Sequence, residues 1–339
     1  MKQFFINVTV FLAVVLMSSC NKEANSISTI TTSTVNAERV VTKGIGDKSP
    51  HTLVYIETND VNPLNAGDWY LDDGTTFFDY VCLFASNIHK TTVGNETQPT
   101  LYLNDKLTPI LEGGLSTYVQ PLQNQGIGVL LGVLPDWQYI GFSNMTTTQA
   151  DEFATILHYA INKYGLQGVV FDDEYSGTNS IVNGSYSRII SKLRDLEPNT
   201  KIVVFDWGGT SYISSSAAGE IDYANHGYFN GYFIPYYYSS ISGMNAARWS
   251  PISLEIGGSY NYSSSNLQSW ALSAVNGGYG ETMFFNLRPI SDNDPSTILQ
   301  DIATGADWGT VSYTNADRTQ DITPVSGGYT ITYAMATAN

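Results

Sequence analysis

Three consecutive acidic residues end one strongly apolar segment of this chain. The run from Gly168 to Phe171 is followed directly by Asp172, Asp173 and Glu174. A short, β-branched apolar run is typical of a strand that is buried on both faces of a parallel sheet. Placing carboxylates beside such a buried strand costs desolvation free energy, so their presence suggests a function. In β/α barrels the carboxyl ends of the strands carry the reactive groups, so these acids are the first candidates for chemistry.

The alternation of side chains along a strand separates the three acids. Val170, Asp172 and Glu174 point to one face, and Phe171 and Asp173 point to the other. Asp172 and Glu174 then lie roughly 6–7 Å apart at Cα. Two carboxylates this close push their pKa values apart, so one can stay protonated while the other is ionised. General-acid chemistry at a glycosidic bond requires this. Alternatively, the acids cap the next helix or lie in solvent, and their role is structural.

The composition favours a neutral, polar ligand. The 339 residues include 31 acidic and 15 basic ones, and the formal net charge of −16 argues against a nucleic acid partner. Charged residues make up only 14% of the chain, which has 23 Tyr and 6 Trp. Aromatic rings can cover the C–H faces of a sugar, while amides and hydroxyls match its hydroxyl groups. The alternative is that many of these rings simply fill the core.

Neither a metal nor a cofactor is indicated. The four histidines are scattered without the spacing of metal ligands; they are His51, His89, His158 and His226. Cys82 lies in the apolar run Val81–Phe84 and is most simply a small core residue. The other cysteine, Cys20, belongs to the N-terminal signal described next, so we expect no intramolecular disulfide.

The N-terminus has the pattern of a bacterial lipoprotein signal. Lys2 precedes a short apolar segment, Phe4–Met17, and two serines lead to Cys20. We expect residues 1–19 to be a signal peptide, Cys20 to be lipidated, and residues 20–49 to form a flexible tether. The alternative is an ordinary secretory signal with an incidental cysteine. The expected location is the outer membrane, on its periplasmic or cell-surface face, with the lipid as the only membrane anchor.

Strand and helix patterns alternate over residues 50–307. Eight segments predict strands: Thr52–Glu57, Phe78–Ser86, Ile127–Leu134, Gly168–Glu174, Lys201–Asp206, Tyr232–Tyr237, Ile252–Ile256 and Thr282–Leu287. Helical spacing indicates helices over Thr148–Tyr164, Asn183–Leu196, Asn266–Asn276 and Ser296–Thr304. This alternation predicts an α/β fold, a single (β/α)8 TIM barrel domain. A doubly wound open sheet is the alternative, but no Gly-rich phosphate fingerprint follows the first strand.

The segment 308–339 differs from the rest. It is rich in Thr, Tyr and Gly, and the alternation in Tyr329–Tyr333 follows Gly327-Gly328. This pattern predicts a β-rich extension, a β-hairpin packed on the barrel.

The run Leu166–Tyr175 resembles the catalytic strand of glycoside hydrolase family 18, and in particular of its endo-β-N-acetylglucosaminidases, in which Phe-Asp-Asp-Glu-Tyr is typical. The likeness extends over roughly residues 51–305. It includes Val54–Asn59, Phe84–Ile88, Gln125–Leu131, Pro235–Tyr237, Leu254–Gly257 and Phe285–Leu287. The resemblance therefore implies a barrel enzyme of this family.

The resemblance also implies a role for each candidate residue. The family reaction is substrate-assisted: the 2-acetamido oxygen of the sugar attacks the anomeric carbon, and water opens the oxazolinium intermediate with retention. Glu174 would be the acid and then the base, and Asp172 would orient the acetamido group. Tyr236 would donate to the acetamido carbonyl, unless it only lines the barrel. The candidate substrate-binding residues are Asn286, Tyr237 and Glu57, although Tyr237 could instead face the helices.

The chain departs from the family pattern at three positions. Gln167 and Val170 stand where the family has its first two acids, and Ile234 precedes Pro-Tyr where Asn or Gln is common. Val170 matters most, because it lies on the inward face one step below Asp172. An acid there can share a proton with Asp172, so in this chain Asp172 must be tuned in another way. We expect activity to survive, because the two residues that act on the substrate are present.

Three functions fit the resemblance. The first is an endoglycosidase that cleaves the GlcNAc-β1,4-GlcNAc core of N-linked glycans of the high-mannose or hybrid class, acting as a monomer on a glycan or glycoprotein. The second is a chitinase, but the segment between Ile256 and Thr282 is too short for the inserted module that processive chitinases often carry. The third is a glycan-binding protein on a disabled barrel, although such relatives typically lose the acid that is kept here as Glu174.

Overall fold

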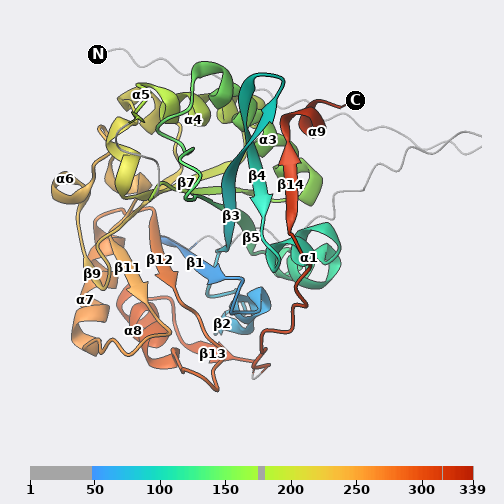
Figure 1. Cartoon of the computed structure of the whole chain (residues 1–339). Helices are drawn as coiled ribbons and strands as arrows, with labels where there is room; N and C mark the ends of the chain where they lie inside the picture. Colours follow the sequence, from blue (N-terminus) through green and yellow to red (C-terminus); the bar gives the residue numbers. More distant parts are fainter. Residues whose placement is uncertain (1–47, 175–179, 315, 339) are drawn as a thin grey trace, which may run out of the picture. The chain divides into compact units, whose positions relative to one another are not determined.

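The structure, a computed structural model, describes residues 48–174, 180–314 and 316–338 (Figure 1). Its strands are β1 His51–Glu57, β2 Trp69–Leu71, β3 Tyr80–Val93, β4 Glu96–Leu103, β5 Gly128–Pro135, β6 Gly168–Asp172, β7 Lys201–Asp206, β8 Tyr223–His226, β9 Gly231–Tyr232, β10 Trp249–Ser250, β11 Ile252–Glu255, β12 Glu281–Phe285, β13 Val311–Tyr313 and β14 Tyr329–Thr332.

The helices lie mostly between these strands. They are α1 Leu107–Glu112, α2 Gln120–Asn124, α3 Thr147–Tyr164, α4 Ser185–Leu196, α5 Ser215–Ala218, α6 Pro235–Tyr238, α7 Ser264–Asn276, α8 Ser296–Ala306 and α9 Tyr333–Thr337. Short 3₁₀ and π turns add η1 Pro63–Asp68, η2 Leu115–Val119, η4 Gly208–Tyr212 and η5 Ala246–Arg248. None of the helices in the described part of the chain is long and apolar enough to cross a membrane.

A sheet of parallel strands forms an α/β barrel. The strands pair in the order β10, β8, β7, β6, β5, β3, β1, β12 and β11. The two ends of this order, β10 and β11, are separated in the chain only by Pro251. Because they are two halves of one interrupted strand, the sheet returns on itself. The fold therefore agrees with the predicted barrel rather than with an open doubly wound sheet.

The barrel has an inner and an outer apolar layer, as strand alternation requires. The inner cluster consists of side chains that point into the barrel; examples are Leu53, Leu130, Val170 and Met283. The larger outer cluster fills the space between strands and helices and includes Val169 and Phe171 from β6. Val170 and Phe171 thus face opposite sides, so Asp172, two residues after Val170, is directed inward.

The clearest predicted helix is confirmed. Helix α3 begins after Thr146, whose side chain accepts from the Gln149 amide while the Gln149 side chain accepts from the Thr146 amide. It ends at Gly165, which has the left-handed φ of 63° that terminates many helices. Helices α4, α7 and α8 also match the expected segments closely, so α3 and α4 fix the two ends of the strand that carries the acids.

Two features of the first half were not predicted. The second barrel strand continues far beyond Ser86 to Val93 and returns as β4 in an antiparallel hairpin. The tip of this hairpin is rich in Thr, Lys and Gln and has no apolar face of its own, so its pattern indicated no strand.

The predicted sixth strand, Tyr232–Tyr237, is wrong. The strand that pairs with β7 in the barrel is β8, Tyr223–His226. Only Gly231–Tyr232 is extended in the predicted segment, and it pairs antiparallel with β11 as β9. Pro235 then starts the short helix α6, since proline fits the first turn of a helix and has no amide to offer a ladder.

The predicted C-terminal hairpin is also wrong. Strand β13 pairs antiparallel with β2, and β14 pairs antiparallel with β4 (Figure 1). The two C-terminal strands therefore each pair with a strand from the first half of the domain instead of pairing with each other. The unpaired edge of β4 explains this arrangement, because an exposed strand edge readily accepts another strand.

Candidate active site

Asp172 is a buried acid at the carboxyl end of β6. Its side chain is 5% exposed and points into the barrel above Val170. Burial raises its pKa well above the ordinary value, and the negative charges of Glu174 and Asp173 raise it further. Its Oδ1 atom is buried without a hydrogen-bond partner among the described residues. Asp172 is therefore held where the neutral form of the acid is favoured.

Glu174 lies two residues beyond Asp172, where the strand has ended and the side chain is exposed. The same-face relationship expected from alternation thus places one buried acid beside one solvent-accessible acid. The end of β6 therefore presents an exposed, reactive carboxyl group to a ligand beside a buried acid whose neutral form is favoured. The segment that follows, 175–179, lies outside the described residues.

Asp173 has the structural role expected from the alternation. It is 1% exposed and accepts a hydrogen bond of 2.6 Å from the Ser143 hydroxyl, in the loop between β5 and α3. It therefore ties the end of β6 to the neighbouring loop, on the side away from the barrel interior.

Two predicted substrate-binding residues, Glu57 and Asn286, meet where β1 and β12 end. The backbone N–H of Asn286 donates to Glu57 Oε1 over 3.2 Å, and the side-chain nitrogen of Asn286 donates to Glu255 Oε1 over 2.9 Å. Arg288 Nε donates to Asn286 Oδ1 over 2.5 Å. Asn286 has a left-handed φ of 60°, a strained backbone for a residue other than glycine, and such strain concentrates at functional sites.

This group of polar residues is also electrostatically unusual. Burial raises the pKa of Glu57, and its Oε2 atom is buried without a partner in the described part of the chain. Arg288 opposes this shift through its positive charge. A carboxyl group with one unused oxygen beside an amide and a guanidinium is well suited to recognise sugar hydroxyls.

Tyr236 and Tyr237 do not occupy the position expected for them. Both lie on α6 and are 84% and 72% exposed, with their rings in an edge-to-face pair at 4.7 Å. The observed sixth strand, β8, is followed by Gly227 and then by an aromatic residue, Tyr228. Sequence reasoning missed Tyr228 because β8 contains Asn225 and His226 and lacks an apolar run.

Aromatic side chains surround the ends of β7, β8 and β12. Trp207 and Tyr228 are both 46% exposed and meet edge to face at 5.8 Å. Phe229 packs against Phe285 at 4.6 Å and against Phe205 at 5.8 Å. These rings continue the inner layer of the barrel outward, beside the strand that carries Asp172.

A second group of exposed rings lies in the loop after β5. Trp137 and Tyr139 are both 78% exposed. Tyr139 has a left-handed φ of 59°, and its carbonyl accepts from the Asn144 side chain over 3.1 Å. Asp136 pairs with His89 of the β3–β4 hairpin. This contact attaches the loop to the hairpin. The loop thus holds two large rings in solvent at the carboxyl end of a barrel strand.

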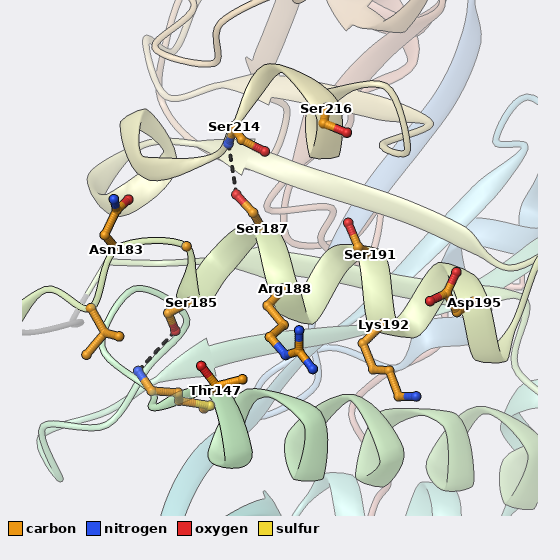
Figure 2. A pocket seen from close by; sticks show the side chains of 13 residues that line it. Thr147, Asn183, Ser185, Ser187, Arg188, Ser191, Lys192, Asp195, Ser214 and Ser216 are labelled. Atoms are coloured by element: carbon orange, nitrogen blue, oxygen red, sulfur yellow. Dashed lines mark hydrogen bonds between the residues drawn. The ribbon is translucent and has the colours of Figure 1, made fainter.

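One cavity is lined by none of these residues. It has a volume of about 510 Å³ and runs along α4, between the start of α3 and the segment around α5 (Figure 2). Serine and threonine hydroxyls are the most frequent groups in its lining, and the hydroxyls of Ser185 and Ser187 already accept from backbone amides. No group of three or more His, Cys, Asp or Glu residues that could hold a metal ion occurs in the described ranges.

Comparisons with known proteins identify relatives of this chain. No protein-family model matches the chain. The chain is 34% identical over 256 residues to an endo-β-N-acetylglucosaminidase of Flavobacterium sp. (strain SK1022), covering 73% of this chain and 77% of that protein. It is 29% identical over 256 residues to endo-β-N-acetylglucosaminidase F1 of Elizabethkingia meningoseptica, covering 70% and 75%.

Solved structures extend the likeness to the fold. EndoBT-3987 of Bacteroides thetaiotamicron, solved with a Man5GlcNAc product, matches with a TM-score of 0.69 at 25% identity, covering 83% of this chain and 66% of that chain. This chain thus spans slightly less than two thirds of that protein. The catalytic domain of a family GH18 chitinase from the fern Peteris ryukyuensis matches with a TM-score of 0.52 at 15% identity, covering 76% and 98%, and shows the fold alone.

An α/β barrel with a buried and an exposed carboxyl group at the end of one strand has the architecture of a glycoside hydrolase. The extent of the sequence match makes the assignment narrower. The chain belongs to the endo-β-N-acetylglucosaminidases of glycoside hydrolase family 18.

Proposed function

We propose that this enzyme cleaves the GlcNAc-β1,4-GlcNAc core of N-linked glycans and leaves one sugar on the protein. The observation that carries the proposal is the pairing of buried Asp172 with exposed Glu174 at the end of β6. The choice of glycan is supported by EndoBT-3987, whose solved complexes contain a Man5GlcNAc product and a Man9GlcNAc2Asn substrate. High-mannose or hybrid chains are therefore the proposed substrates.

The proposed mechanism uses the substrate as its own nucleophile. Glu174 gives its proton to the leaving oxygen while the 2-acetamido oxygen attacks the anomeric carbon, and an oxazolinium ring forms. Asp172 accepts a hydrogen bond from the acetamido N–H and stabilises the positive charge that develops there. Glu174 then takes a proton from water, which opens the ring, and the configuration is retained.

The donor to the acetamido carbonyl is reassigned. The family places a tyrosine for this role at the end of the sixth strand, and in this chain the sixth strand is β8. We therefore assign the role to Tyr228 rather than to Tyr236. Its ring packs beside Trp207 at the carboxyl ends of β7 and β8, and β7 is the neighbour of β6 in the sheet order.

Tyr236 and Tyr237 take a different proposed role, together with Trp137 and Tyr139. All four rings are more than 70% exposed; Trp137 and Tyr139 lie in the loop after β5, and the two other tyrosines lie on α6. Exposed rings in such numbers favour stacking on sugar faces, and we assign them to the outer residues of the glycan. Glu57 and Asn286 are assigned to hydroxyl groups nearer the scissile bond.

The attachment to a membrane rests on the sequence. Cys20 and the tether up to residue 47 lie outside the described residues. We propose that the lipidated Cys20 holds the enzyme at the outer membrane, on its periplasmic or cell-surface face, as a monomer. Metabolic labelling with a fatty-acid probe tests this: Cys20→Ser should abolish incorporation of label into the protein, and label retained in that variant would refute the assignment.

Mass spectrometry of a high-mannose glycoprotein after incubation tests the proposed function. We expect a loss that leaves one N-acetylglucosamine at each site. Glu174→Gln should lower release at least 10³-fold, an order of magnitude taken from the loss of general-acid catalysis, and should keep glycan binding. Release from chitin oligomers alone would favour the chitinase, and binding without any release would favour a lectin.

A further inference from the structure

A buried turn in the loop between β5 and α3, residues 141–145, lies against the end of β6. The Phe142 ring of this turn is fully buried and packs at 4.8 Å on Phe171 of β6 and at 5.0 Å on Tyr186 of α4. Ser143, the next residue, is fully buried as well. The turn therefore lies between the strand that carries the acids and the helix that follows them.

Ser143 is bonded to both ends of the segment that follows β6. Its hydroxyl donates to Asp173 Oδ2 over 2.6 Å, and its carbonyl accepts from the backbone N–H of Val182 over 2.9 Å. Asp173 directly precedes Glu174, and Val182 comes shortly before α4. Glu174 thus belongs to a segment whose two ends are hydrogen-bonded to a single residue of the neighbouring loop.

Ser185, at the start of α4, holds the same turn independently of the Ser143 hydroxyl. The Ser185 hydroxyl donates to the Phe142 carbonyl over 2.5 Å and accepts from the backbone N–H of Met145 over 3.0 Å (Figure 2). A variant without the Ser143 hydroxyl therefore keeps the turn attached to α4. Such a variant loses the hydrogen bond between the turn and the acidic segment.

The loop after β7 supports the acidic segment from the other side. A Cβ atom added at Gly209 would lie 2.1 Å from both Ser143 Oγ and Asp173 Oδ2. One added at Gly208 would lie 2.0 Å from the Asp173 carbonyl oxygen and 3.7 Å from Glu174 Cα. The shorter distances are far below van der Waals contact, so only glycines allow this approach. The loops on both sides of β6 therefore fix the backbone that carries Glu174.

We propose that Ser143 is a positioning residue for Glu174 and acts through its hydrogen bond to Asp173. A general acid must reach the leaving oxygen at hydrogen-bond distance, and a small displacement of its carboxyl group is costly. Asp173 points away from the barrel interior, so the neighbouring loop can hold it while Glu174, the next residue, faces the ligand. The middle acid of the run thus serves the reaction without touching the substrate. This inference rests on the proposed function.

The dependence on the leaving group tests the proposal. Ser143→Ala should lower kcat for a high-mannose glycopeptide roughly 10- to 100-fold, the cost of a misplaced catalytic group, with KM within about twofold. The 4-nitrophenyl glycoside of Man5GlcNAc releases a stable phenolate that needs no proton from Glu174. The ratio of kcat/KM for the glycopeptide to kcat/KM for this aryl glycoside should therefore fall at least about 10-fold in Ser143→Ala. A general loss of folded enzyme would lower both values equally.

Two further variants complete the comparison. Ser250→Ala is the matched control, because Ser250 on β10 is fully buried and its hydroxyl donates to the Ile252 carbonyl over 2.8 Å. It loses one buried hydrogen bond as well, but its ratio should equal that of the wild type. Gly209→Ala keeps both hydrogen-bonding groups and places a methyl group between them, so its ratio should fall as in Ser143→Ala. If Ser143→Ala does not fold, Gly209→Ala decides.

Hydrogen exchange followed by mass spectrometry separates this inference from the proposed function. The peptide that contains Asp173 and Glu174 should exchange about 2- to 10-fold faster in Ser143→Ala than in the wild type or Ser250→Ala, as expected for one lost hydrogen bond. This result does not depend on glycan release. If the wild type releases N-glycans, an unchanged ratio in Ser143→Ala overturns the inference. If the wild type releases none, the proposed function fails, and unchanged exchange overturns the inference separately.

Discussion

The carboxylate of Asp206 accepts a hydrogen bond of 3.0 Å from the backbone amide of Ser240. Asp206 ends β7 inside the barrel wall, whereas Ser240 follows the exposed helix α6. The hydroxyl groups of Thr210, Ser239 and Ser240 also donate to this carboxylate. One buried side chain thus fixes the loop that displays Tyr236 and Tyr237.

Replacing Asp206 should therefore loosen the α6 loop. Asp206→Asn places an N–H where an acceptor is needed and leaves buried donors unsatisfied, so we expect a loss of about 2–3 kcal/mol in the free energy of unfolding. Denaturant unfolding measures this loss, and the KM for a high-mannose glycopeptide should rise in the same variant. Asp294→Asn is the control, because the hydrogen bonds that Asp294 accepts from Ser296 are exposed. Equal stability of both variants would contradict the anchoring role.

Trp137 should contribute to glycan affinity. Its ring is 78% exposed, so truncation removes a stacking surface without opening the core. We expect Trp137→Ala to raise KM roughly 5- to 30-fold, which corresponds to about 1–2 kcal/mol, with kcat little changed. Leu272→Ala, at an exposed apolar residue on α7, should leave KM unchanged. If both variants behave alike, Trp137 does not contact the substrate.

Tyr139 allows a test in which stability and binding change in opposite directions. Its φ of 59° is unfavourable for any side chain with a Cβ, and glycine relieves that strain. Tyr139→Gly should therefore match or exceed the wild-type stability, by up to about 1 kcal/mol, and yet bind glycans more weakly. Thermal unfolding and titration of the Glu174→Gln protein with glycan measure the two effects. Unchanged affinity would remove Tyr139 from the binding surface.

The protein should become less stable as the pH rises, because Glu281 keeps its proton in the folded state after the unfolded chain has lost it. Burial raises the pKa of Glu281 from 4.5 to about 8. The unfolded chain loses this proton first, so stability decreases between these two values by up to about 1.4 kcal/mol per pH unit. Glu281→Gln should flatten this decrease. Unfolding measured at pH 5 and pH 8 checks the difference, and an identical slope in both proteins would contradict a neutral Glu281.

The segment after the barrel should contribute to the stability of the whole domain. Ile331 of β14 is fully buried and packs in the outer apolar cluster. Ile331→Ala should lower the free energy of unfolding by about 2–4 kcal/mol, and Thr330→Ala, at the exposed neighbour, by less than about 0.5 kcal/mol. Single-transition unfolding by fluorescence measures both. A negligible effect of Ile331→Ala would mean that this strand is only loosely attached.

Strands with continuous apolar runs could be predicted from the sequence, and β6 shows why. Its residues are buried on both faces, so the run Val169–Phe171 stands out and the acids after it are conspicuous. Strand β8 could not be predicted in this way. Asn225 and His226 are buried with hydrogen-bond partners that are distant in the sequence, Tyr55 and Pro251, and no local pattern reveals such partners. The aromatic segment 232–237 has the composition of a strand and took its place in the prediction.

The same limit applies to the site. Asp172 and Glu174 belong to one segment, so alternation along a single strand is enough to predict their relationship. The contact between Asn286 and Glu57 joins residues that are 229 positions apart, and the bond from Tyr55 to Asn225 spans 170 positions. Only closure of the barrel creates these neighbours, so no local sequence pattern can reveal them.

The pairing of β14 with β4 also bears on biosynthesis. Strand β4 is made early, but the strand that covers its edge is made only after the whole barrel. Until then the nascent chain presents an open row of amides and carbonyls that other chains can pair with. We therefore expect the enzyme to depend on chaperones that shield β4 while the remainder of the polypeptide is being synthesised.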